Sequence, residues 1–170
     1  GAIAIRYMAR HREYGVSKLV LIDAAAPYLI QTPTNPYGVP IKIVDDIIQG
    51  TYNDRPKMLR NFGDIFFFQH ITEAFSDWFF QLGLQAAGWA TAAIAKTWIK
   101  EDLSSDLEKI NVPTLIIHGI HDNVVPFKLG ELQNKGIKSS RLISFKYSGH
   151  ATFYDERDKF NKELVEFIGE

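Results

Sequence analysis

The sequence contains no cysteine, no long apolar run and no excess of charge of one sign, and each absence excludes a class of protein. Without cysteine there is neither a disulfide framework nor a thiolate nucleophile or thiolate metal site. No apolar stretch approaches the roughly 18 residues that span a bilayer, and the first residues do not resemble a signal peptide. A formal net charge of -1 offers nucleic acid or an anionic membrane no electrostatic attraction. These features predict a soluble, cytoplasmic protein whose partners include neither nucleic acid nor a membrane.

The chain alternates between helical and strand-like patterns. Helical spacing of apolar residues predicts helices at both ends of the chain, and a continuous apolar run predicts a buried strand at residues 18–23. A second buried strand is predicted at residues 114–119 and a third strand at residues 141–147. Residues 27–40 have the proline and glycine content of a loop, and residues 41–100 are mostly helical in pattern and rich in aromatic side chains. This alternation predicts an α/β protein with a parallel sheet.

The closing helix is predicted from the stretch "DERDKFNKELVEFI", residues 155–168. Asp155 has the residue type and position of its N-cap. The spacing places four apolar side chains on one face of this helix, namely Phe160, Leu164, Val165 and Ile168.

Polar residues follow two of the predicted strands. Asp122 comes shortly after "TLIIHG", and His150 follows "LISFKY" within Ser-Gly-His. Parallel strands that are neighbours have their carboxyl ends at the same edge of the sheet, so the Asp122 carboxylate is expected to accept a hydrogen bond from His150. A carboxylate that orients an imidazole is the acid and base pair of a nucleophilic triad.

Several stretches resemble the α/β-hydrolase superfamily, and within it the cofactor-free (non-haem) haloperoxidase and aryl esterase group. They are "DLEKINVPTLIIHGIHDNVVPF", "YSGHATFYDERDKFNKELVEFI" and, at the front, "GAIAIRYMARH" with "VSKLVLIDAAAPY". The resemblance covers nearly the whole chain. It implies the C-terminal portion of an α/β-hydrolase fold with a helical cap insertion: hydrolase core at residues 1–26, cap at 27–101 and core again at 102–170.

The family's nucleophilic serine would precede Gly1, and no G-x-S-x-G occurs in the sequence. The resemblance therefore implies two triad members, Asp122 and His150, with the serine on an N-terminal half that is a separate chain, a cleaved segment or a region absent from this sequence. It also places Ala25, Leu29, Val124 and Phe127 where the family has pocket-lining side chains.

The activity implied is hydrolysis of small carboxylic, including aryl, esters by a serine hydrolase. Perhydrolysis, in which peroxide replaces water and the peracid oxidises halide, is implied as a side activity of the same triad. No metal or organic cofactor is implied, and the oligomeric state stays open, a homo-oligomer included.

Other interpretations of single residues and of the whole chain are weaker. His118 and His121 lack a visible third ligand for a metal, and Asp23 precedes Ala-Ala-Ala-Pro, which favours a structural turn. The alternative function is a non-catalytic binding or interaction protein with a hydrolase-like fold. A Rossmann-type nucleotide binder is disfavoured because no G-x-G-x-x-G follows the first strand.

Overall fold

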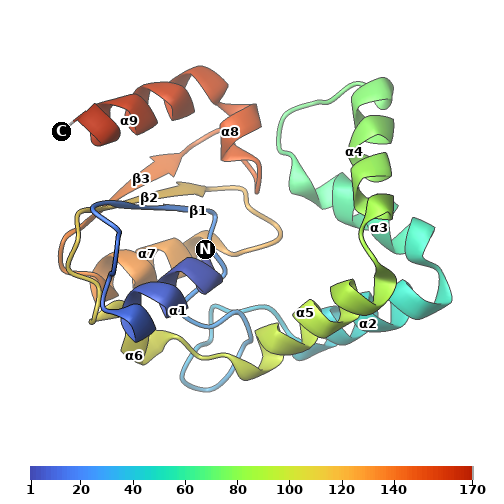
Figure 1. Ribbon diagram of the computed structural model, residues 1–170. Coiled ribbons are helices and arrows are strands. Elements are labelled where there is room, and N and C mark those ends of the chain that lie inside the picture. The colour runs from blue at the N-terminus through green and yellow to red at the C-terminus, as the bar shows by residue number, and fades with distance from the viewer. Residues whose placement is uncertain (170) are drawn as a thin grey trace.

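A computed structural model describes residues 1–169 (Figure 1). Three parallel strands form one sheet with helices on both faces, as the alternating pattern predicts. In chain order the elements are α1 (Ala2–His11), β1 (Leu19–Ile22), α2 (Ile41–Asn53), α3 (Arg55–Phe66), α4 (Glu73–Gln85), α5 (Gly88–Lys100), α6 (Ser104–Leu107), β2 (Thr114–Gly119), α7 (Phe127–Gly136), β3 (Ser140–Phe145), α8 (Thr152–Asp155) and α9 (Arg157–Gly169).

The strand order is β1-β2-β3, so the two strands that precede Asp122 and His150 are neighbours. Thr114 pairs with Ser140 and Gly119 with Phe145, in parallel register. All six residues of the central strand β2 are buried, as expected for a central strand of a parallel sheet that is covered on both faces. Both loops therefore leave the sheet at the same edge.

Two hydrophobic layers enclose the sheet. On one face Ile5 and Met8 of α1 pack with Leu21 and Ile116 of the strands. On the other face Phe160 and Phe167 of α9 pack on Leu115, Ile117 and Phe145. Full burial of one such side chain contributes roughly 1.5–3 kcal/mol, so these layers hold the strand ends, and the loops that follow them, in place.

Helices α2 to α5, called the cap below, form a separate layer that extends from the core and curves back toward it (Figure 1). Val44 and Ile48 of α2 pack against Ala92 and Ala95 of α5. At its far end this layer contributes the rings of Phe66, Phe67, Phe75 and Phe79 to an aromatic cluster that also contains Tyr154 of α8. The helical interpretation of residues 41–100 is confirmed, and the division of the chain into core and cap at the predicted boundaries stays a prediction.

The prediction for the closing helix is wrong in two respects. Asp155 is the last residue of the short helix α8 and does not cap α9, because the chain bends at Glu156 before α9 begins. Val165 and Ile168 are 69% and 62% exposed, since the buried face of α9 is formed by Phe160 and Phe167, with Leu164 packed beside them. Among residues 1–169, none of the helices has the length and apolar character needed to cross a membrane.

Candidate active site

Asp122 and His150 meet at the edge of the sheet. Asp122 lies in the turn that follows β2, and His150 lies in the loop that follows β3. The distance between Asp122 Oδ2 and His150 Nδ1 is 2.8 Å, within the range of a charge-assisted hydrogen bond. The expected contact between these two side chains is present, although their catalytic roles remain a prediction.

The Asp122 carboxylate is buried and oriented by its own turn. Its Oδ1 accepts hydrogen bonds from the backbone N–H groups of Val124 and Val125, each at 2.8 Å. Burial by itself raises the pKa of Asp122, but hydrogen bonds from His118, His150 and Val125 outweigh it and lower the pKa below the ordinary value. The carboxylate is therefore held ionised, with Oδ2 directed at the imidazole of His150.

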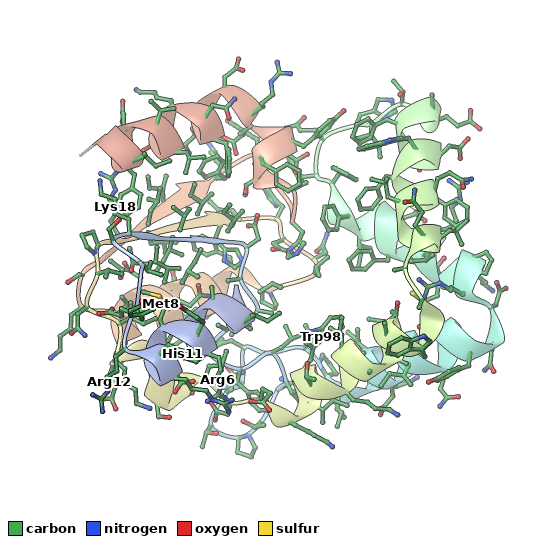
Figure 2. All side chains as sticks on the ribbon, in the orientation of Figure 1. Arg6, Met8, His11, Arg12, Lys18 and Trp98 are labelled. Carbon is green, nitrogen blue, oxygen red and sulfur yellow. The ribbon has the colours of Figure 1, made fainter. Side chains whose placement is uncertain are left out.

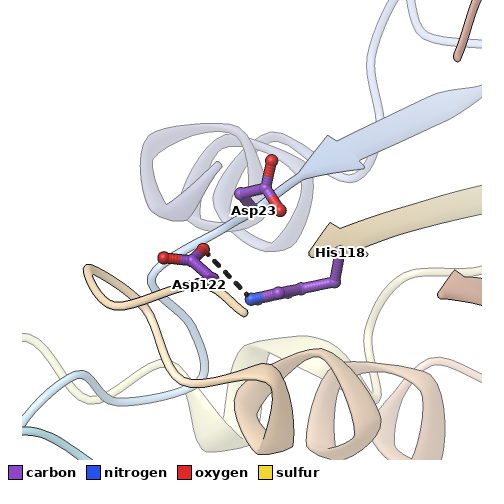
Figure 3. Close-up of side chains that lie close together, drawn as sticks. All are labelled: Asp23, His118 and Asp122. Atoms are coloured by element: carbon purple, nitrogen blue, oxygen red, sulfur yellow. Dashed lines mark ion pairs between the residues drawn. The ribbon is translucent and has the colours of Figure 1, made fainter. Parts of the chain in front are cut away.

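His118 lies behind Asp122 and is fully buried in β2 (Figure 3). Its Nε2 lies 2.9 Å from the carbonyl oxygen of Val125 and 3.5 Å from Asp122 Oδ2. A carbonyl can only accept, so Nε2 carries a proton. Burial lowers the pKa of His118, while the hydrogen bonds to Asp122 and Val125 and the nearby charges raise it above the ordinary value.

The opposite nitrogen of His118 decides which form of the ring fits the site. Among the residues that the structure describes, Nδ1 has no hydrogen-bond partner, and a Cβ at Gly130 would lie 2.7 Å from it. A second proton on Nδ1 would be buried without an acceptor, which is costly. This geometry opposes the direction in which the neighbouring charges shift the pKa of His118, and the form that its hydrogen bonds fit is the neutral ring with its proton on Nε2.

Asp23 immediately follows β1 and connects it to the end of β2 and to the start of α8. Its Oδ1 accepts from Gly119 N at 2.9 Å, and its Oδ2 accepts from Thr152 Oγ1 at 2.7 Å. Asp23 has a φ of 44°, in the left-handed region that aspartate tolerates better than most residues. Burial raises the pKa of this carboxyl above its ordinary value. The expected structural turn thus carries a buried carboxylate that holds the loop of His150.

Asp23, His118 and Asp122 lie close enough together to resemble a metal site, since ligand atoms from all three are within 4.8 Å of one another (Figure 3). Each carboxylate oxygen, however, already accepts a hydrogen bond from the protein, and His118 Nε2 donates to Val125. A cation would have to displace these bonds. His121, the other candidate ligand, stacks on the ring of Phe68 at 4.1 Å. The arrangement therefore fits a hydrogen-bonded support of Asp122 better than a metal centre.

A cavity of about 410 Å³ adjoins His150. Apart from His150, Asp23 and Asn123, its lining is almost entirely aliphatic and aromatic. Three of the four predicted pocket residues, Ala25, Leu29 and Val124, line it. Phe127 is not among the lining residues, because as the first residue of α7 it packs edge-on against His118, with ring centroids 5.8 Å apart. The structure thus does not bring Phe127 together with the other three.

The cap contributes further lining that sequence analysis did not assign. Ile43, Val44 and Ile47 of α2, Phe62 and Ile65 of α3, and Trp98 of α5 face the same cavity. Figure 2 shows Trp98 on α5 beside the central space between cap and core. The signal available in the sequence was only the high apolar and aromatic content of residues 41–100, which does not distinguish packing from ligand contact.

Comparison with known proteins gives a consistent group of relatives. No family model matches the sequence. The chain is 42% identical over 167 residues to the AB hydrolase superfamily protein YisY of Bacillus subtilis, covering 98% of this chain and 62% of that protein. It is 31% identical over 170 residues to the bifunctional esterase/perhydrolase DCH of Acinetobacter calcoaceticus, covering 95% and 61% respectively. For the non-haem haloperoxidase of Rhodococcus erythropolis the identity is 29% over 175 residues, covering 99% of this chain and 64% of that protein.

Among solved structures, the fold is similar to that of the esterase EaEST from Exiguobacterium antarcticum. The TM-score is 0.96 at 43% sequence identity, with 99% of this chain and 63% of that chain covered. The chain thus spans a little over 60% of the length of the relatives it matches. Its parallel sheet and flanking helices are the C-terminal part of an α/β-hydrolase fold, and the chain belongs to the α/β-hydrolase superfamily as a relative of its esterases and non-haem haloperoxidases.

Proposed function

We propose that this chain supplies the acid and base of a serine hydrolase that cleaves small carboxylic esters, and that the nucleophilic serine lies outside these residues. The observation that carries the proposal is the 2.8 Å contact between Asp122 Oδ2 and His150 Nδ1 beside an apolar cavity. With Nδ1 engaged by the carboxylate, Nε2 of His150 remains to exchange a proton with a nucleophile.

The position of α1 supports this assignment. Gly1 lines the same cavity as His150. A Cβ on Gly1 would lie 2.2 Å from Cβ of Ala24, so the residue before α1 and the segment after β1 approach too closely there for any residue but glycine. In the proposed enzyme, residues joined to Gly1 would enter the cavity next to His150, where a serine would meet Nε2.

The proposed reaction has two steps. The serine oxygen attacks the ester carbonyl while His150 Nε2 takes its proton, and the protonated imidazole then gives that proton to the departing alcohol. Asp122, held ionised, stabilises the imidazolium. Water activated by His150 then hydrolyses the acyl-enzyme. The donors that bind the oxyanion would lie, with the serine, outside this chain.

Perhydrolysis is included in the proposal because one relative is named as a bifunctional esterase/perhydrolase. Hydrogen peroxide would attack the acyl-enzyme in place of water, releasing a peracid and the free serine. The peracid would then oxidise halide in solution. Both outcomes use the same imidazole, so removing it should abolish both.

Labelling with a fluorophosphonate tests the proposal on the full-length gene product. We expect one serine outside these residues to be modified, and His150→Ala to abolish labelling together with ester hydrolysis and perhydrolysis. Asp158→Asn serves as a control, since Asp158 is 96% exposed on α9. Failure of the wild-type protein to react would favour the non-catalytic binding protein instead.

A further inference from the structure

The turn between α3 and α4 lies against the loop that carries His150 (Figure 1). Three backbone N–H groups from these two segments converge on the carboxylate of Asp155. Phe68 N and Gln69 N donate to Oδ2 and Oδ1, each at 3.0 Å, and Gly149 N donates to Oδ2 at 2.8 Å. Asp155 is therefore a bridge between the cap and the core.

The two bridged segments adjoin the imidazole directly. Gly149 immediately precedes His150, and Phe68 and Gln69 follow Phe66 after one residue. His150 N donates to the carbonyl oxygen of Phe66 at 2.9 Å, and the Phe66 ring lies edge-on to the imidazole with centroids 5.0 Å apart. The backbone and the ring of His150 thus both contact Phe66. Asp155 binds Phe68 and Gln69, which follow Phe66 in the turn after α3.

A carboxylate suits this position for a chemical reason. It has only acceptors, and its two oxygens can satisfy three converging N–H donors at once, which no neutral side chain of similar size does. Hydrogen bonds to an ionised acceptor are also about twice as strong as neutral ones. Glu156 supports the same loop independently, since its Oε2 accepts from Tyr147 N and Ser148 Oγ at 2.8 Å each.

We propose that Asp155 is a positioning residue for His150: it holds the cap turn on the histidine loop, so that Phe66 sets the location of the imidazole at the cavity. This inference relies on the proposed function only in taking His150 as the base. A displacement of about 1 Å at a reacting group costs on the order of 10²-fold in rate, so loss of the bridge is expected to lower kcat more than it raises KM.

The test uses the full-length protein and three variants. In Asp155→Ala all three bonds are lost, and we expect kcat to fall on the order of 10²-fold, with faster amide hydrogen exchange at Phe68, Gln69 and Gly149. In Asp155→Asn a carbonyl oxygen directed at Phe68 and Gly149 keeps two bonds and loses the one from Gln69, so intermediate values are expected. Asp158→Asn removes the same charge from an exposed site and should match the wild type.

A third measurement separates positioning from general loss of structure. The nitrogen and proton resonances of the His150 ring should shift in Asp155→Ala while the melting temperature stays within a few degrees of the wild type. Should Asp155→Ala fail to fold, the kcat, the amide exchange and the His150 resonances of Asp155→Asn test the inference in its place. Unchanged kcat, or unchanged amide protection, in a folded variant would overturn the inference. If the wild-type protein hydrolyses no ester, the exchange and resonance data still decide it, so the two proposals fail separately.

Discussion

Replacing Asp122 by asparagine should impair the proposed catalysis through the tautomer of His150. Oδ1 of Asp122 receives two N–H donors, from Val124 and Val125, whereas Oδ2 faces His150 Nδ1. An asparagine therefore has one favourable orientation, with its carbonyl oxygen toward the two backbone donors. Its NH₂ group then takes the place of Oδ2, which faces His150 Nδ1 and His118 Nε2 in the wild type. Two N–H groups would thus face another donor in place of an acceptor.

The consequence for His150 follows from donor and acceptor chemistry. To accept a hydrogen bond from that NH₂ group, the imidazole must carry its proton on Nε2, the nitrogen that is meant to take a proton from serine. In serine proteases with this arrangement, the same substitution lowers kcat about 10⁴-fold. We expect a fall on the order of 10³- to 10⁴-fold here, equivalent to about 4–5.5 kcal/mol of transition-state stabilisation.

Steady-state hydrolysis of an aryl acetate by full-length Asp122→Asn measures this fall, and Asp158→Asn is the control of equal charge change. The ring nitrogens of His150 give a second measurement, since their resonances distinguish the two tautomers. A variant that keeps more than a tenth of the wild-type kcat, or whose His150 still carries its proton on Nδ1, would refute the reasoning.

Three further outcomes are expected. Because burial raises the pKa of Asp23, its contribution to stability is present below the pKa of the unfolded chain and is lost as the pH rises through the pKa of the folded protein. The free energy of unfolding of Asp23→Asn, measured by urea denaturation, should therefore rise relative to that of the wild type between pH 4 and pH 8, and a constant difference would contradict this. Ile47→Trp narrows the cavity beside His150, so kcat/KM for a hexanoate ester should fall about tenfold or more relative to acetate, and an equal loss for both would exclude a role of Ile47 in selectivity. Leu115→Ala empties a fully buried site and should cost about 2–5 kcal/mol of unfolding free energy, against about 0.5 kcal/mol or less for the exposed Val165→Ala.

Local sequence patterns were sufficient for the parallel sheet and for the pairing of Asp122 with His150. The continuous apolar run at residues 18–23 predicts a buried strand of a parallel sheet, and parallel strands bring the residues after their carboxyl ends to one edge. Each step uses only the order of residues along the chain. The same rule, applied to the end of β1, would have placed Asp23 at this edge as well.

The boundaries of the last helix and the contacts of Phe127 were beyond these patterns. Periodicity indicates that some face of a helix is buried, but several offsets of the face fit a helix of three to four turns, and the structure buries Phe167 where Ile168 was expected. Phe127 follows the turn of Asp122, yet the start of α7 turns its ring to His118 and away from the cavity.

The sequence by itself determined which segments are strands, that a carboxylate and an imidazole follow two of the strand ends, and that residues 41–100 are mostly helical. Only the tertiary structure decided how that pair is supported. His118 lies next to Asp122, Asp23 accepts a hydrogen bond from Thr152 after the histidine loop, and Asp155 joins the cap to the core. The physical reason is that these are hydrogen bonds of buried or converging polar groups, mostly between residues far apart in the chain. Their partners depend on how the helices pack, which no local periodicity records.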